Sequence, residues 1–247
     1  MKISLLIICL FFVVTVSNAQ STSVDLMQGN FKQMSLFKGN NTGYQGFQTY
    51  GAQNVRGSQF FYPGFQDGSV TTINNEQLTG IYQFLFDKVR QELFITSKTD
   101  KSSSPEVLVA EKQQVKSFSI TTDREHTFVA ARIYDPSNTT DFYELLNKND
   151  SPYTLLKAVK TTFVKMDYRD LEKVKHGDIY DEFVDKTSYY VSYKSGKPRE
   201  ISFRKKNLAN AFQADKKILI ENYIDNHPND DVDEGYLLNL VYSANNY

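Results

Sequence analysis

The densest group of side chains that could do chemistry is an acidic cluster near the middle of the second half of the chain. Its members are Asp178, Asp181, Glu182 and Asp185. Two carboxylates in a cleft can hydrolyse a glycosidic bond, provided that they lie about 5 Å or more apart. Apolar residues alternate with these acids, however, so a solvated face opposite an apolar face explains the same pattern. We favour that interpretation and keep an acid/base hydrolase as the third functional hypothesis.

Two further groups resemble metal sites only in part. The histidines are far apart in the sequence, without the spacing of paired metal ligands; they are His126, His176 and His227. Three residues have the alternate spacing of a calcium loop, but the glycine comes one place late and a leucine replaces the bidentate glutamate; they are Asn229, Asp231 and Asp233. Helix capping accounts for the second group better. We therefore predict no metal site, no cofactor and no catalytic residue.

The basic and glycine-containing segments do not indicate phosphate binding. Residues 195–198 (SGKP) lack the upstream glycine of a phosphate loop, and a proline stands where Ser or Thr would bind magnesium. They are predicted to form a turn. The run Arg204, Lys205 and Lys206 is too short for a nucleic-acid patch in a chain of net charge −1, so we interpret it as a solvated face. No nucleic-acid partner is predicted.

The N-terminus predicts export. Lys2 precedes an apolar run that ends in small residues, so residues 1–19 are predicted to be a signal peptide cleaved after Ala19. The only cysteine, Cys9, would leave with it, which excludes disulfides and thiolate chemistry in the processed chain. We expect a periplasmic, outer-membrane-associated or extracellular protein with no transmembrane segment after cleavage.

The rest of the chain divides into three segments. Residues 20–56 form a predicted N-terminal arm that is rich in aromatic residues and glycine. Residues 57–203 contain successive strand signals with short polar links, which favour antiparallel pairing. Residues 204–247 have helical periodicity in short stretches that must pack on the sheet or on each other. The predicted fold class is α+β and mainly β: an antiparallel meander, curled or folded into a barrel- or sandwich-like body, with a small C-terminal helical cap.

Two local structures are predicted in more detail. A β-hairpin runs through residues 189–203, with Gly196 supplying the positive φ of its turn and Pro198 at the start of the return strand. A helix starts near residues 231–234 (DVDE), which are predicted to provide an N-cap and a capping-box glutamate.

Several short segments are similar to one group of proteins. They are NAQ at 18–20, GS at 57–58, FDKV at 86–89, ELFI at 92–95, VKSF at 115–118, YDEFVDKT at 180–187 and YY at 189–190. With them the chain resembles small exported proteins of Bacteroidetes-type bacteria that have no assigned activity. The resemblance implies an exported address and a β-rich body, and it assigns no functional residues.

These observations favour a non-enzymatic envelope protein that acts by binding a macromolecule, either an envelope protein or a glycan. The alternative is a β-rich binding module for a small apolar ligand or glycan, held inside a curled sheet. The binding residues and the oligomeric state stay open.

Overall fold

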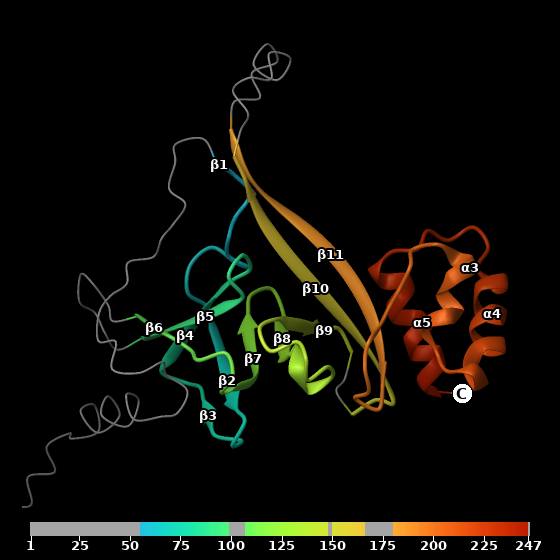
Figure 1. Cartoon of the computed structure of the whole chain (residues 1–247), viewed down its shortest axis with the longest axis horizontal. Coiled ribbons are helices and arrows are strands. Elements are labelled where there is room, and N and C mark those ends of the chain that lie inside the picture. The colour runs from blue at the N-terminus through green and yellow to red at the C-terminus, as the bar shows by residue number, and fades with distance from the viewer. Residues whose placement is uncertain (1–54, 99–106, 148–149, 166–179, 247) are drawn as a thin grey trace, which may run out of the picture. The chain divides into compact units, whose positions relative to one another are not determined.

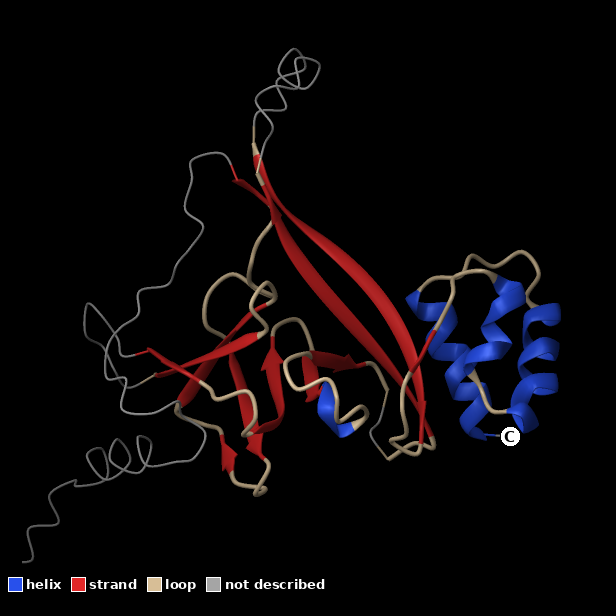
Figure 2. Cartoon of the chain, viewed as in Figure 1, coloured by secondary structure: helices blue, strands red, loops and turns tan. Residues whose placement is uncertain are grey.

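A computed structural model describes residues 55–98, 107–147, 150–165 and 180–246 (Figure 1). The predicted signal peptide and almost all of the predicted arm lie outside these residues. The described chain is mostly β, with its α-helices confined to the C-terminal region (Figure 2), so the fold class is confirmed at this level. The described strands form two sheets and no closed barrel. None of the described helices has the length and apolar character needed to cross a membrane.

The larger sheet contains nine of the described strands, in the order β1-β11-β10-β9-β8-β7-β2-β3, with β12 beside β11. Their bounds are β1 Val55–Arg56, β2 Asp67–Thr72, β3 Gln77–Leu78, β7 Val115–Thr121, β8 Glu125–Ala130, β9 Phe142–Leu145, β10 Tyr153–Val164, β11 Asp181–Tyr193 and β12 Arg199–Glu200. From β7 to β11 each strand is antiparallel to the next, as the predicted meander requires. β1, the last two residues of the predicted arm, pairs parallel to β11 instead.

A smaller sheet interrupts the meander between β3 and β7. Its strands are β4 Tyr82–Asp87, β5 Glu92–Ser97 and β6 Val107–Val109, all antiparallel. Phe86 of β4 packs on the larger sheet, with its ring centroid 5.1 Å from those of both Phe118 and Phe128. Phe142 also lies in this aromatic cluster, 5.2 Å from Phe118. The small sheet therefore covers part of one face of the larger one.

The C-terminal region covers the next part of the same face. Its elements are α3 Lys205–Leu208, the 3₁₀ turns η2 Ala209–Ala211 and η3 Ala214–Lys216, α4 Lys217–Asn226 and α5 Glu234–Asn246. They share one buried cluster with β10 and β11, in which Leu155 and Val191 from the sheet meet Leu237 and Leu240 from α5. The Asn245 side chain accepts a hydrogen bond from the Tyr153 backbone N–H (2.7 Å) and donates to its carbonyl (2.9 Å). This pairing holds the end of α5 on β10.

The opposite face of the larger sheet has its own core. Val129, Tyr143 and Leu156 are buried there with Ala131 and Tyr134, which follow β8 in and after the 3₁₀ turn η1 Ala131–Ile133. Burial raises the pKa of Tyr134 to about 12. Both faces of the central strands are therefore covered, which explains why successive residues are buried in β9 and in the first four residues of β10.

The start of α5 differs from the prediction. The helix begins at Glu234, and Asp233 is the N-cap, because its Oδ1 accepts the backbone N–H of Tyr236 (2.7 Å). Glu234 is thus the first helical residue and not the third, so it does not form the predicted capping box. Its carboxylate reaches the sheet instead.

The predicted hairpin exists, but its turn is built differently. The Gly196 N–H donates to the Tyr193 carbonyl (2.9 Å), and the two central residues, Lys194 and Ser195, have φ of 48° and 56°. Two consecutive positive φ values are typical of a type I′ turn. Gly196 does not have the positive φ that we predicted for it, and the return strand β12 has only two residues, starting directly after Pro198.

We predict that Ser195→Gly stabilises the protein. Glycine removes the steric cost of positive φ, about 1–2 kcal/mol, and this exceeds the entropy that glycine adds to the unfolded chain, so the expected gain is about 0.5–1 kcal/mol. Urea unfolding of residues 20–247 measures it, with Ser195→Ala as the control that keeps the penalty. A loss of stability in Ser195→Gly would contradict the turn assignment.

Candidate functional site

Charged side chains cluster where the aromatic cluster under the small sheet meets the core under the C-terminal helices. We call this cluster the ionic network; its members are Arg124, His126, Glu144, Lys157, Tyr189 and Glu234. Strand pairing places Glu144, Lys157 and Tyr189 in a row, because Glu144 lies opposite Lys157 and Lys157 lies opposite Tyr189. His126 projects from the same face of β8, two residues from Phe128, which lies opposite Glu144. Glu234 joins this row from the start of α5.

Two carboxylates share two cations in the network. Lys157 Nζ lies 2.8 Å from Glu234 Oε2 and 3.9 Å from Glu144 Oε2. Arg124 lies 3.5 Å from Glu144 Oε1 and 4.0 Å from Glu234 Oε1. His126 donates from Nδ1 to Glu144 Oε1 (2.7 Å). The Glu144 side chain is only 4% exposed, so these partners supply the compensation that a buried charge requires.

The Tyr189 hydroxyl completes the contacts of Glu234 by donating to its Oε2 (2.8 Å). Burial, followed by this hydrogen bond, raises the pKa of Tyr189 well above its ordinary value. Burial alone would raise the pKa of Glu234, but the hydrogen bonds from Lys157 and Tyr189 outweigh it, so the pKa lies below its ordinary value. Glu234 is therefore charged at neutral pH and fixes the first turn of α5 on the sheet.

The ionic network was not predicted, although the sequence contains a signal for it. Glu144 is a lone acid in the apolar stretch 142–146, and Lys157 is a lone base in the stretch 153–159. Charged residues are almost never fully buried unless they are paired. A single charge within a strand that is apolar on both sides therefore predicts a buried partner, although not which one.

The acidic cluster does not converge on one point. Asp178 lies outside the described residues, whereas Asp181 and Glu182 lie opposite β1 and on different faces of β11. Asp185 accepts hydrogen bonds from Lys88 Nζ (2.6 Å) and from the Thr161 hydroxyl. Asp181 and Asp185 share a face, but four strand residues span about 13 Å. Asp185 therefore has a structural role, joining β11 to the turn after β4.

The remaining predicted residues are also held in structural contacts. His227 donates from Nδ1 to the Tyr223 carbonyl (2.7 Å), and His176 lies outside the described residues. Asp233 caps α5, as predicted for the group Asn229, Asp231 and Asp233. No group of acidic, histidine or cysteine side chains in the described ranges could hold a metal ion.

The basic run divides between two environments. Arg204 and Lys206 are exposed, in agreement with the predicted solvated face. Lys205 is half-buried, and its Nζ donates to the carbonyls of His227 (2.7 Å) and Pro228 (2.8 Å). The prediction is therefore wrong for Lys205, which ties α3 to the chain that follows α4.

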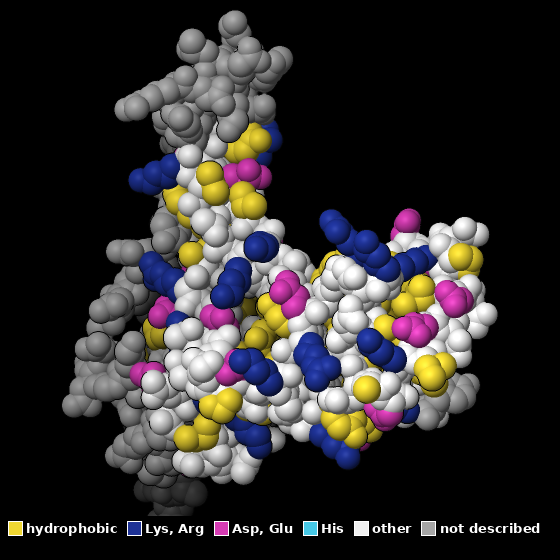
Figure 3. All heavy atoms as spheres, turned by 45° about the vertical axis from the view of Figure 1, so that its right-hand side comes forward, with side chains coloured by type: hydrophobic (Ala, Val, Ile, Leu, Met, Phe, Trp, Pro, Cys, Tyr) yellow, Lys and Arg dark blue, Asp and Glu magenta, His cyan; other side chains and the backbone are white. Residues whose placement is uncertain are grey.

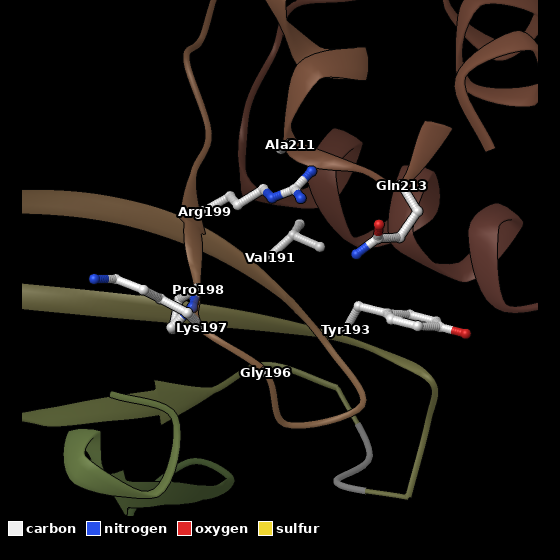
Figure 4. Close-up of a pocket in the computed structure, with 8 residues that line it drawn as sticks. All are labelled: Val191, Tyr193, Gly196, Lys197, Pro198, Arg199, Ala211 and Gln213. Atoms are coloured by element: carbon white, nitrogen blue, oxygen red, sulfur yellow. The ribbon is translucent and has the colours of Figure 1, made fainter. Parts of the chain in front are cut away.

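A pocket of about 450 Å³ lies between the hairpin and the helical region (Figure 4). We call it the hairpin pocket; it is lined by Val191, Tyr193, Gly196, Lys197, Pro198, Arg199, Ala211 and Gln213. Residues 195–198 were predicted only as a turn, and that turn forms one wall. Arg199 lies directly opposite Val191 in the pairing of β11 with β12, so both side chains project from the same face.

Polar groups converge in this pocket from two parts of the chain. Figure 4 shows the Arg199 guanidinium and the Gln213 carboxamide pointing toward the space above Val191, whereas Lys197 points away. Arg199 Nη1 donates to the Phe212 carbonyl (3.0 Å), and this bond fixes the guanidinium next to Gln213. Lys197 Nζ lies 3.4 Å from Asp135 Oδ2. The arrangement can bind a polar ligand, and its residues come from segments that sequence spacing alone does not bring together.

Comparisons of the chain with protein-family models, with curated proteins and with solved structures find no match. The resemblance to exported Bacteroidetes-type proteins therefore stays a prediction.

We predict that Glu234→Gln destabilises the fold by about 1–2 kcal/mol at pH 7, because it removes charge-assisted hydrogen bonds from a partly buried site. The lowered pKa means that the carboxylate contributes its stability above its ordinary pKa of 4.5, and that this contribution disappears as pH falls through the lower folded value. The difference between wild type and variant should thus shrink below about pH 4.

Urea unfolding at pH 7 and at pH 3.5 tests this expectation. Glu221→Gln on the exposed side of α4 is the matched control and should change stability little at either pH. A difference between Glu234→Gln and wild type that persists unchanged at low pH would contradict the role assigned to the carboxylate.

Proposed function

We propose that this is an exported protein of the cell envelope, periplasmic, outer-membrane-associated or extracellular, that acts by binding a glycan and has no catalytic activity of its own. The hairpin pocket carries the proposal. Its volume, about 450 Å³, lies in the range of roughly 300–1,000 Å³ that is typical of ligand sites. It also combines an apolar floor at Val191 with two convergent polar side chains, Arg199 and Gln213.

The polar lining favours a glycan over a small apolar ligand. An apolar ligand would cover the Arg199 guanidinium and the Gln213 amide without pairing them, which is unfavourable. The hydroxyl groups of a sugar can pair with both. The pocket also lies between strands and helices, so this proposal does not require a cavity inside a curled sheet.

A protein partner is the second candidate, and the part of the β10–β11 strand pair that includes residues 160–164 and 182–186 favours it. On one face of this ribbon Lys160 lies opposite Lys186, and Thr162 lies opposite the half-exposed Val184. Like charges directly across a strand pair repel, although Lys160 also reaches Asp141 (3.1 Å). A partner with acidic residues around an apolar centre would complement this face.

The exposed apolar surface supports the protein-partner hypothesis less strongly than the pocket supports the glycan hypothesis. On the face seen in Figure 3, hydrophobic side chains lie in separate spots between Lys and Arg side chains. The exposed large hydrophobic residues of the described chain come from many elements. They are Tyr62, Ile73, Ile133, Val164, Val184, Phe203, Ile218 and Tyr242. Stable protein interfaces are centred on a buried cluster, which scattered residues do not supply.

We predict that Gln213→Trp abolishes glycan binding by filling the hairpin pocket. Residues 20–247 are immobilised, and retention of polysaccharide from an envelope extract is measured for wild type, Gln213→Trp and the control Gln113→Trp, which lies in an exposed turn. We expect at least tenfold weaker retention for Gln213→Trp alone, with an unchanged unfolding midpoint.

Equal retention by wild type and Gln213→Trp would contradict the pocket. In that case the same extract is tested for bound protein with the double variant Val164→Ser, Val184→Ser. If a protein binds to wild type and to Gln213→Trp but not to the double variant, a protein partner is the function and the glycan proposal is wrong.

A further inference from the structure

The hairpin pocket has a charge preference that narrows its ligand class. Among the described residues that line it none is acidic, and two, Lys197 and Arg199, are basic. Lys197 points away from the pocket toward Asp135, so the guanidinium of Arg199 is the charge that faces the ligand space. The pocket thus presents one fixed positive charge above an apolar floor.

Arg199 is held in a way that leaves most of its donors available. A guanidinium has five N–H donors in a planar fork, and one of them is bonded to the Phe212 carbonyl (3.0 Å). That bond orients the group before any ligand arrives. A planar oxyanion can therefore bind two of the remaining donors at once, which is the geometry in which arginine recognises a carboxylate.

Gln213 supplies the complementary neutral contacts. Its carboxamide points into the same space as Arg199 and offers both donors and an acceptor. A carboxylate needs donors only, so the acceptor of Gln213 has a use when the ligand also carries hydroxyl groups. Val191 and Pro198 add apolar surface to the lining, which suits the C–H face of a sugar ring.

We propose, on the basis of the glycan-binding function above, that the hairpin pocket recognises an acidic sugar unit whose carboxylate is bound by Arg199 and whose hydroxyl groups are bound by Gln213. The ligand class is therefore a uronic acid or a similar carboxylated sugar within a polymer. A free peptide C-terminus carries the same carboxylate without the hydroxyl groups.

Calorimetric titration of residues 20–247 tests this assignment with three probes: a galacturonic acid trimer, a neutral galactose trimer and trialanine with a free C-terminus. We expect the galacturonate trimer to bind at least tenfold more tightly than the other two. Its affinity should fall as salt is raised, because the contact is partly electrostatic.

Substitutions distinguish the effect of the Arg199 charge on binding from any effect on the fold. Arg199→Gln should weaken galacturonate binding at least tenfold and bring it to the level of the neutral trimer, whereas Arg204→Gln removes an equal charge from an exposed position outside the pocket and should have no effect. Arg199→Gln also loses the bond to Phe212, so Gln213→Glu is the second test. Its carboxylate would pair with the guanidinium and exclude an anion without removing that bond.

The possible outcomes distinguish this inference from the proposed function. Galactose and galacturonate trimers that bind equally, and that are both lost in Gln213→Trp, would overturn the acidic ligand while leaving glycan binding intact. Tighter binding of trialanine would overturn the sugar in favour of a peptide terminus. If none of the three probes binds, the inference is wrong, and polysaccharide retention decides the proposed function separately.

Discussion

The pairing of β10 with β11 is the constraint on which the other elements depend. Every residue of β10 has a partner in β11, from Tyr153 opposite Tyr193 to Val164 opposite Glu182. β9 joins one side of this pair, and β1 and β12 join the other. Helix α5 lies along β10, held near both ends by Asn245 and Glu234. These two residues span about 17 Å of helix, and their partners on β10 span about 13 Å of strand, so one helix matches the length of sheet that it covers.

The ionic network makes the register of this sheet specific. A shift of one residue in a strand turns every side chain to the other face. Such a shift in β10 would move Lys157 away from Glu144 and Glu234 and leave the two carboxylates with one of their two shared cations. Losing one partner of a buried pair costs far more than the pair contributes. The apolar side chains on either side could pack in several registers, whereas the ion pairs form in only one register. The network therefore selects the position of α5 as well as the pairing of β9 with β10.

Local sequence patterns predicted the positions of the strands and helices, but they did not predict the long-range contacts between them. Alternation and turn residues located the central strands, and Asp233 marked the start of α5, because these signals lie within a few residues of the structure that they specify. The positive φ values on Lys194 and Ser195 were missed because glycine, the usual residue for that conformation, stands one position later. Glu234 was misassigned because its partner Lys157 is 77 residues away. The hairpin pocket was not predictable for the same reason, since Arg199 and Gln213 meet only after the helices pack on β11.

The ionic network and the hairpin pocket use neighbouring positions on one face of β11. Tyr189 belongs to the network, Val191 forms the pocket floor, and Tyr193 forms its side. Of these alternate residues of one strand, the first therefore holds α5 on the sheet and the next two line the ligand pocket. The other half of the pocket comes from residues 211 and 213, which are in place only when the C-terminal region is docked. A ligand that contacts Arg199 and Gln213 together binds only this docked state and must stabilise it by mass action. The contacts that position α5 thereby preorganise the pocket. The entropy of ordering residues 211 and 213 is lost on folding and is not lost again when the ligand binds.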